Sequence, residues 1–137
     1  MTDTDLTWRS TLDLAAMLAA GEVSAVEVLD AHLDACAARN PDLNVVVTLD
    51  VDRARTEAES VDAARVAGAA LGPLAGVPMT VKDSLMREGL RTTSGAPELA
   101  DYLPDRDAAP VAALRRAGAI IYGKTNLPIY AGDVQSY

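Results

Sequence analysis

The twelve residues from Gly72 to Asp83 constrain the fold of this chain more than any other stretch. Their first seven positions hold two glycines and two prolines, a composition that predicts a constrained loop. The next residues, 77–81, are apolar or β-branched except for Pro78, and proline is tolerated at the first positions of a strand. The stretch therefore predicts a loop that leads into a short strand and ends in a charged pair.

The charged pair is Lys82 and Asp83. Side chains alternate along a strand, so the two should point to opposite faces of the sheet. This alternation allows one face to hold a desolvated amine while the other holds a solvated or hydrogen-bonded carboxylate. On residue type alone, a lysine at the end of a strand is most often exposed to water.

Two patterns of the capping-box type predict helices near the N-terminus. Ser10 and Ser24 are each followed three residues later by an acidic residue. Gly21 is a natural stop for the first helix, and Asn40-Pro41-Asp42 is expected to end the second. We therefore expect a helical hairpin over about residues 10–39.

Helices and strands alternate through the rest of the chain. Strands are expected at residues 45–49, 77–82 and 119–122, and helices at residues 50–67 and 108–117. Asp50 and Asp107 are the expected N-caps of these two helices. On the exposed face of the first, two ion pairs are expected at i,i+4 spacing, Arg53 with Glu57 and Arg55 with Glu59. The alternation predicts an α/β layer structure.

Four segments, in this order and spacing, resemble the amidase signature family. They are G-P-L-A-G-V-P-M-T-V-K-D at residues 72–83, R-T-T-S-G-A-P at 91–97, P-D-R-D-A at 104–108 and G-A-I-I-Y-G-K-T-N-L at 118–127. Before about residue 40 the resemblance is limited to the helical pattern. It implies an α/β/α layered fold with a mixed central sheet, of which this chain would be the N-terminal part, with its α/β portion over residues 43–137.

The resemblance also implies a reaction. In that family a lysine, a serine in a cis peptide and a nucleophilic serine hydrolyse carboxylic amides through an acyl-enzyme, without a metal or cofactor. Carried onto this sequence, Lys82 is the base of the triad, and the segment with both serines is expected after Tyr137. We therefore expect this 137-residue chain to be inactive by itself.

Six polar residues are expected to support the site, namely Asp83, Thr92, Thr93, Ser94, Thr125 and Asn126. Three of them lie in the irregular segment 88–102, and long loops of this kind in compact domains are often functional. Lys124-Thr125-Asn126 is interpreted as a loop that follows the last strand near the active site. Neither Ser94 nor any other serine of the chain is expected to be the nucleophile.

Two departures from the family pattern bear on the substrate. Ser84 stands where asparagine is frequent, and Ile129 stands where glutamate is frequent. The second departure leans away from the A-type subunit of glutamyl-tRNA amidotransferase, which belongs to the same family. The sequence favours an amidase that acts on linear amides. The A-type amidotransferase subunit is the alternative, and a non-catalytic interaction module is a further alternative.

Residues 118–125 also match G-x-x-x-x-G-K-[ST], the pattern of a phosphate-binding loop. The intervening Ala-Ile-Ile-Tyr favours a strand, so we interpret the match as a coincidence and a nucleotide-binding domain as the less favoured alternative. His32 and Cys36 are spaced as a metal pair on a helix, but two ligands do not make a zinc site. A core thiol and a boundary imidazole are expected instead.

Bulk composition restricts the partners. The net charge of −8 disfavours binding to nucleic acid or to an anionic membrane. No apolar run approaches the ~18 residues of a membrane span, and the acidic, polar start is unlike a signal peptide. One cysteine suits a reducing cytoplasm. We expect a small amide as the substrate, with a homodimer as an allowed assembly.

Overall fold

The computed structural model describes residues 6–134. Within them the helices are α1 (Thr11–Ala20), α2 (Ala25–Leu43), α3 (Val51–Val66) and α4 (Ala109–Arg116). The strands are β1 (Val46–Leu49), β2 (Pro78–Lys82) and β3 (Ile120–Thr125), and short 3-10 turns are η1 (Leu6–Trp8), η2 (Pro97–Leu99) and η3 (Ile129–Ala131). The three strands form one sheet in the order β1-β3-β2. The sheet is mixed as predicted, since β3 is antiparallel to β1 and parallel to β2.

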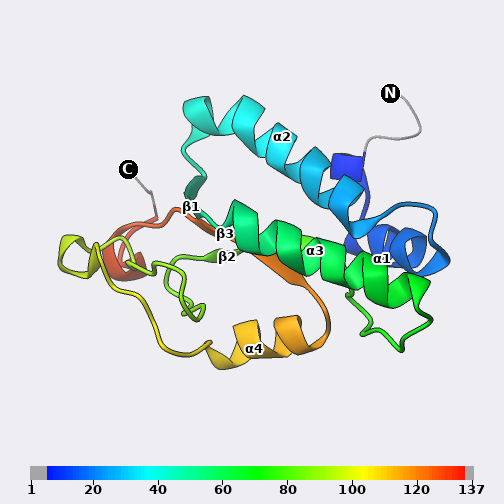
Figure 1. Ribbon diagram of the computed structural model, residues 1–137. Helices are drawn as coiled ribbons and strands as arrows, with labels where there is room; N and C mark the ends of the chain where they lie inside the picture. Colours follow the sequence, from blue (N-terminus) through cyan, green and yellow to red (C-terminus); the bar gives the residue numbers. More distant parts are fainter. Residues whose placement is uncertain (1–5, 135–137) are drawn as a thin grey trace.

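The three helices α1, α2 and α3 cover one face of the sheet and α4 covers the other (Figure 1). The first face buries an apolar cluster that includes Leu29 of α2, Ala58 of α3 and Ile120 of β3. The second face buries Val81, Ile121 and, from α4, Val111. Ile120 and Ile121 reach opposite faces because neighbouring side chains alternate along a strand. The α/β/α layering is therefore confirmed.

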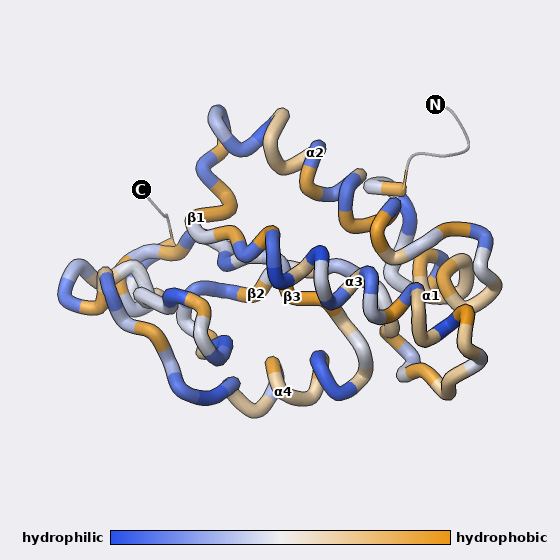
Figure 2. The backbone as a smooth tube through the Cα atoms, viewed as in Figure 1, coloured by the Kyte–Doolittle hydropathy of each residue, from blue (hydrophilic) through white to orange (hydrophobic). Residues whose placement is uncertain are grey.

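Helix α3 packs closely against its neighbours because its inward residues are small. Ala54 and Ala58 are 1% and 0% exposed, and Ala25 at the start of α2 is also fully buried. In Figure 2, α3 is mostly hydrophilic and the first half of β3 behind it is hydrophobic. The apolar character of this layer therefore comes more from the strand than from the helix that covers it.

Both capping boxes form as predicted. Ser10 Oγ and Ser24 Oγ each accept the backbone N–H three residues on, at 3.1 Å. Helix α1 ends at Gly21, whose φ of 72° is the left-handed conformation that glycine adopts without strain. Capping depends on residues within four positions of one another, and for that reason the sequence reveals it.

Helix α2 runs further than predicted. It continues through Pro41 to Leu43, because a proline in the last turn removes only one backbone donor. The helix ends at Asn44, whose N–H donates to the Asn40 carbonyl at 2.8 Å and whose φ is 48°. The Asn40 side chain bonds both the N–H and the carbonyl of Val46, at 2.7 and 2.8 Å, so it joins α2 to β1 instead of ending the helix.

Neither expected aspartate cap makes a capping hydrogen bond, and only Asp50 stands at the expected N-cap position. Asp50 stands at the N-cap position of α3 but makes no capping hydrogen bond, and its carboxylate lies 2.7 Å from Arg53 Nε. Helix α4 begins after Ala108. Asp107 instead accepts the Glu88 N–H at 2.7 Å and pairs with Arg115 at 2.6 Å, so both carboxylates prefer a charged or backbone donor elsewhere.

The i,i+4 ion pairs expected along α3 are replaced by pairs between elements. Glu57 binds Arg87, which is 1% exposed, at 3.0 Å and lies 3.7 Å from Arg115. Arg55 binds Asp30 of α2. Burial lowers the pKa of Arg87, and the nearby cations Arg115 and Arg53 lower it further. The Glu57 carboxylate of α3 thus links the buried guanidinium in the loop after β2 to Arg115 of α4.

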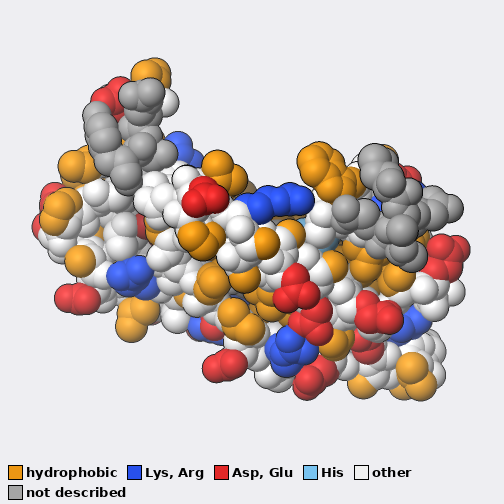
Figure 3. All heavy atoms as spheres, turned by 90° about the horizontal axis from the view of Figure 1, so that it is seen from above, with side chains coloured by type: hydrophobic (Ala, Val, Ile, Leu, Met, Phe, Trp, Pro, Cys, Tyr) orange, Lys and Arg blue, Asp and Glu red, His pale blue; other side chains and the backbone are white. Residues whose placement is uncertain are grey.

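Figure 3 shows hydrophobic side chains scattered among acidic and basic ones on the face seen from above. No helix of residues 6–134 is long and apolar enough to cross a membrane.

Candidate functional site

Lys82 is the last residue of β2 and its side chain is exposed. Its Cα is in register with Thr125 of β3, and its carbonyl accepts the Leu85 N–H at 2.8 Å. The expected alternation is confirmed, because the neighbouring Asp83 is buried. Within residues 6–134 the Lys82 side chain is exposed to water and its amine is not desolvated, which matches the expectation from residue type.

Asp83 is the hydrogen-bonded carboxylate that the alternation allows. It is 1% exposed, and Oδ2 accepts the Thr93 N–H at 3.0 Å and the Thr93 hydroxyl at 2.5 Å. Its backbone N–H donates to the Thr125 carbonyl at 3.1 Å, and its carbonyl accepts the Ser94 N–H at 3.0 Å. Asp83 therefore joins the end of β2 to the end of β3 and to the loop that carries Thr93 and Ser94.

The loop at residues 92–95 is held in a backbone conformation that few residues adopt. Ser94 and Gly95 have φ values of 53° and 68°. A Cβ on Gly95 would come within 2.7 Å of the Leu127 carbonyl oxygen, so this position accepts only glycine without a shift. The Ser94 carbonyl accepts the Tyr130 N–H at 2.8 Å, which ties the loop to η3.

Thr125 and Asn126 lie where β2 and β3 end. The sequence predicts a loop over residues 124–126, and this prediction is wrong for residues 124 and 125. Lys124 and Thr125 belong to β3, which runs three residues past the predicted end. The Asn126 backbone N–H donates to the Val45 carbonyl at 2.7 Å, and its side-chain amide donates to the Asn44 carbonyl at 3.1 Å. All six polar residues expected to support the site thus gather where β2 and β3 end.

Lys124 is the residue that the sequence analysis missed. It is 0% exposed, and its Nζ donates to the Leu85 carbonyl at 2.7 Å and to Thr92 Oγ1 at 2.6 Å. Nζ also lies 3.3 Å from Asp83 Oδ1, an ion-pair distance without the alignment of a hydrogen bond. Burial lowers the pKa of Lys124, and the Asp83 carboxylate opposes that change.

A shift in strand register explains where Lys124 points. Met79 of β2 is in register with Ile121, whereas Thr80 is in register with Gly123, so Tyr122 is an extra residue in β3. Beyond the shift, Val81 is in register with Lys124. Lys124 therefore lies on the α4 face with Val81 and Asp83, although strict alternation from Ile121 would send it to the other face.

Residues 120–125 form a strand in the middle of the sheet, as the composition of Ala-Ile-Ile-Tyr predicted. The Lys124 amine is directed into the protein and bonded there. A phosphate-binding loop needs this segment as an exposed loop, so the nucleotide-binding alternative has no structural basis in this chain.

A shallow pocket of about 260 Å³ adjoins the polar cluster. Its wall includes Asp83, Thr93, Thr48 and Asn126. Arg91 also lines it and donates to Thr48 Oγ1 at 3.1 Å and to the Val47 carbonyl at 3.2 Å. The pocket places one guanidinium and several hydroxyl and amide groups next to the buried carboxylate.

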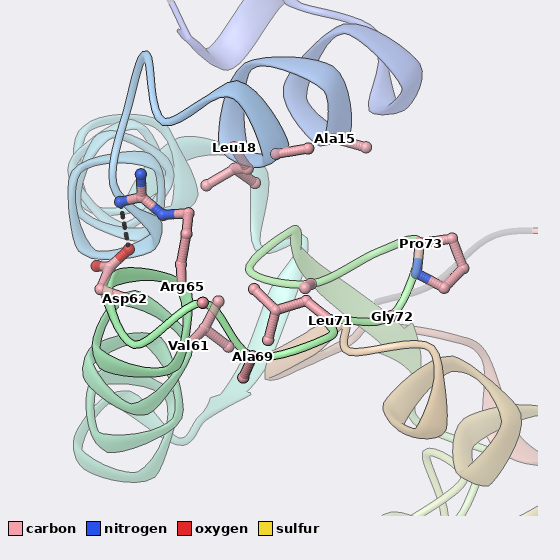
Figure 4. Close-up of a pocket in the computed structure, with 12 residues that line it drawn as sticks. Ala15, Leu18, Val61, Asp62, Arg65, Ala69, Leu71, Gly72 and Pro73 are labelled. Carbon is pink, nitrogen blue, oxygen red and sulfur yellow. Dashed lines mark hydrogen bonds and ion pairs between the residues drawn. The ribbon is translucent and has the colours of Figure 1, made fainter.

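A larger pocket of about 460 Å³ lies elsewhere, between α1, the end of α3 and the loop after it (Figure 4). Leu18 and Val61 give it an apolar wall, and Asp62 pairs with Arg65 at 3.4 Å beside it. It contains none of the residues gathered at the ends of β2 and β3, so volume alone does not identify the site of chemistry.

The two side chains on α2 that are spaced as a metal pair, His32 and Cys36, have the surroundings of ordinary structural residues. His32 Nδ1 lies 2.8 Å from the Val28 carbonyl oxygen, and Cys36 is half-buried. Across residues 6–134 no three His, Cys, Asp or Glu side chains are grouped so that they could hold a metal ion.

Comparison with known proteins identifies the family. The Amidase family model matches residues 27–136. The A-type subunit of glutamyl-tRNA(Gln) amidotransferase from Acidothermus cellulolyticus is 47% identical over 127 residues, which are 93% of this chain and 25% of that protein. The solved peptide amidase of Stenotrophomonas maltophilia superposes with a TM-score of 0.82 at 36% identity, over 96% of this chain and 26% of that one. A bacterial aryl acylamidase superposes with a TM-score of 0.84 at 28% identity, over 90% of this chain and 26% of that one.

This chain therefore spans about a quarter of the length of the relatives it matches. The match is spread over both the helical and the α/β portions, and the structural agreement extends over nearly all of the described residues. The chain belongs to the amidase signature family.

Proposed function

We propose that this chain supplies the lysine base of an enzyme that cleaves the C–N bond of a carboxylic amide through an acyl-enzyme. The observation that supports it is the position of Lys82, the last residue of β2 at the edge where the polar residues of the family's segments gather. The two serines of the triad would come from sequence beyond residue 137.

Lys82 would act as a proton acceptor. A lysine amine is a base only in its neutral form, which burial favours. Lys82 is exposed here, so in this proposal the rest of the full-length enzyme covers its side chain at the end of β2 and removes water from the amine. Asp83 does not counter this effect, because its carboxylate is buried on the other face.

The proton transfers balance in two half-reactions. Lys82 Nζ takes a proton from the cis-peptide serine, which takes one from the nucleophilic serine as that oxygen attacks the amide carbonyl. The C–N bond breaks, the leaving amine receives the proton from Lys82, and an ester with the serine remains. Water then attacks the ester with the same groups as base and acid, which releases the carboxylic acid.

A second candidate is the same bond cleavage in the A-type subunit of a glutamyl-tRNA amidotransferase. The identity of 47% to a protein of that name favours it. Ile129, which stands in η3 where glutamate is frequent, speaks against it. In this candidate the ammonia released from the amide would pass to an acyl acceptor instead of to solvent.

The test uses the full-length enzyme and a panel of amides that includes glutamine, small primary amides and aryl amides. Ammonia or amine release is measured with and without glutamyl-tRNA(Gln) and ATP. Release from small amides without tRNA supports the amidase, whereas release only from glutamine in the presence of the tRNA supports the amidotransferase.

Lys82→Ala should lower turnover by at least ~10², and Lys82→Arg should do no better because a guanidinium does not deprotonate. The matched control is Arg106→Ala, which removes an exposed cation from the loop before α4 and should leave turnover unchanged. Near-normal turnover in Lys82→Arg would show that Lys82 is not the base.

A further inference from the structure

The buried amine of Lys124 holds both ends of the turn that follows Lys82. Its Nζ donates to the Leu85 carbonyl at 2.7 Å and lies 3.3 Å from Asp83 Oδ1. The Leu85 N–H donates to the Lys82 carbonyl at 2.8 Å and closes the turn. The position of the Lys82 backbone therefore depends on where the Lys124 side chain lies.

The Asp83 carboxylate lies between Lys124 and the loop at residues 92–95. Oδ1 faces the Lys124 amine, and Oδ2 accepts both hydrogen bonds from Thr93. Thr92 from the same loop accepts a hydrogen bond from Lys124. Three segments distant in sequence are thus joined by one pair of opposite charges that is almost fully buried.

The two faces of β2 present different charged groups. On the α4 face, Asp83 is the charged side chain that acts on the Lys124 amine, and Leu85 and Thr92 contribute neutral oxygens. On the face of Lys82, the groove that Thr80 lines also receives His32 and Arg39 from α2. The carboxylate nearest to Lys82 in sequence is therefore bound to a different lysine.

We propose that Lys124 is a positioning residue for amide cleavage, which binds the Asp83 carboxylate on the α4 face, fixes the turn after Lys82 and withholds that carboxylate from Lys82. The proposal rests on the proposed function, in which Lys82 is the base. An unpaired carboxylate at the next residue would favour the ammonium form of Lys82, because a nearby opposite charge stabilises the charged state. Lys124 would prevent this without touching the substrate.

The test measures kcat and the pH dependence of kcat/KM on full-length enzyme, with an amide that the panel shows to be cleaved. Lys124→Met leaves Asp83 without its cation. The expected results are a kcat about tenfold lower, since a small misplacement of a catalytic group is costly, and an acid limb moved to higher pH by about one unit.

The double variant Lys124→Met/Asp83→Asn separates charge from packing, because it keeps the new methionine and removes the carboxylate. Its acid limb should return to the wild-type pH even though its kcat stays low. Arg116→Met is the matched control, since it removes one cation from the exposed end of α4 and should change neither quantity.

An acid limb at the same pH in wild type, Lys124→Met and the double variant would show a structural role only and overturn the proposal. If Lys124→Met does not fold, the same two quantities are measured on Asp83→Asn, and they decide whether the proposal holds. A kcat lowered about tenfold, with the limb at or below the wild-type pH, supports positioning, whereas an unchanged kcat or a limb at higher pH overturns it. Failure of the proposed function is distinguishable, because it appears as full turnover in Lys82→Ala.

Discussion

The two faces of the sheet bury different kinds of side chain. The face under α1, α2 and α3 buries an apolar cluster of ten residues. The α4 face buries an apolar cluster of three, and next to it a polar group made of Lys124, Asp83 and Thr92. Apolar burial has no preferred direction, whereas a buried ion pair and its hydrogen bonds require particular positions. The first face therefore provides stability, and the second determines the geometry at the ends of β2 and β3.

The largest expected effect comes from studying residues 1–137 without the rest of the enzyme. Both β1 and β2 pair only with β3 among the described strands, so each has an outer edge without a strand partner. Unpaired edges promote aggregation. The isolated chain should show no amide turnover and should form aggregates on size-exclusion chromatography. Turnover that a serine-directed reagent abolishes would contradict the expected absence of a nucleophile.

One substitution on each face compares stability with geometry in the full-length enzyme. Leu29→Ala on the apolar face should lower the free energy of unfolding by ~2–5 kcal/mol, because Leu29 is fully buried. Thr92→Val on the α4 face should cost ~1–3 kcal/mol, because it leaves the Lys124 amine short of an acceptor.

These two variants should differ in turnover more than in stability. The folded fraction of Leu29→Ala should keep nearly normal kcat, whereas Thr92→Val should slow the reaction. Denaturant titration and kcat of each variant provide the measurements. The contrast between the faces fails if Leu29→Ala slows the folded enzyme as much as Thr92→Val does.

Two glycines with positive φ extend the comparison to the backbone. Gly76 has φ of 83° and a Cβ there would meet the Ala25 Cβ at 2.8 Å, on the apolar side. Gly95 has φ of 68° and faces the Leu127 carbonyl on the side of the site. Gly76→Ala and Gly95→Ala should each cost ~1–3 kcal/mol in strain. Only Gly95→Ala should also change KM or kcat, and equal kinetic effects would argue against a special role for the loop.

The smallest expected effect is the pH dependence of the free energy of unfolding that Asp107, next to α4, contributes. Burial alone would raise the pKa of Asp107, but the Glu88 N–H and the Arg115 guanidinium outweigh it and lower the pKa. The stabilisation is therefore present above the unfolded-state pKa and is lost as pH falls through the folded-state pKa. As the pH falls from 5 toward 2, wild type should therefore lose more stability than Asp107→Asn. Parallel urea midpoints for the two proteins across this range would contradict it.

Features that depend on near neighbours were predictable from the sequence. The capping boxes at Ser10 and Ser24 need residues only three positions apart, and both form. The mixed layered fold and the family followed from the alternation of elements along the chain and from four short segments taken together in their order and spacing. Asp107 was assigned to the wrong partner because its donors, Glu88 and Arg115, come from segments that only the folded chain brings together.

The candidate site shows the same division. The gathering of Asp83, Thr93 and Ser94 followed from the order of the family's segments, and the alternation of Lys82 and Asp83 followed from strand geometry. The burial of Lys124 could not be predicted, because it depends on a register shift between β2 and β3 and on the distant Leu85 carbonyl. A lysine at the end of a strongly apolar strand was the one available signal.

The extra residue at Tyr122 has a consequence for deletions and for sequence alignment. Strand parity from Ile121 to Lys124 is inverted by one position, so the two side chains share a face although three positions separate them. Deleting Tyr122 would place Lys124 two positions after Ile121, where strict alternation keeps both on the α4 face, so the deletion should remove the bulge and leave the lysine buried. Swapping Tyr122 for another large apolar residue would keep the parity. When relatives are aligned, a one-residue gap at this point is therefore compatible with the same buried charge, provided that the lysine itself is retained.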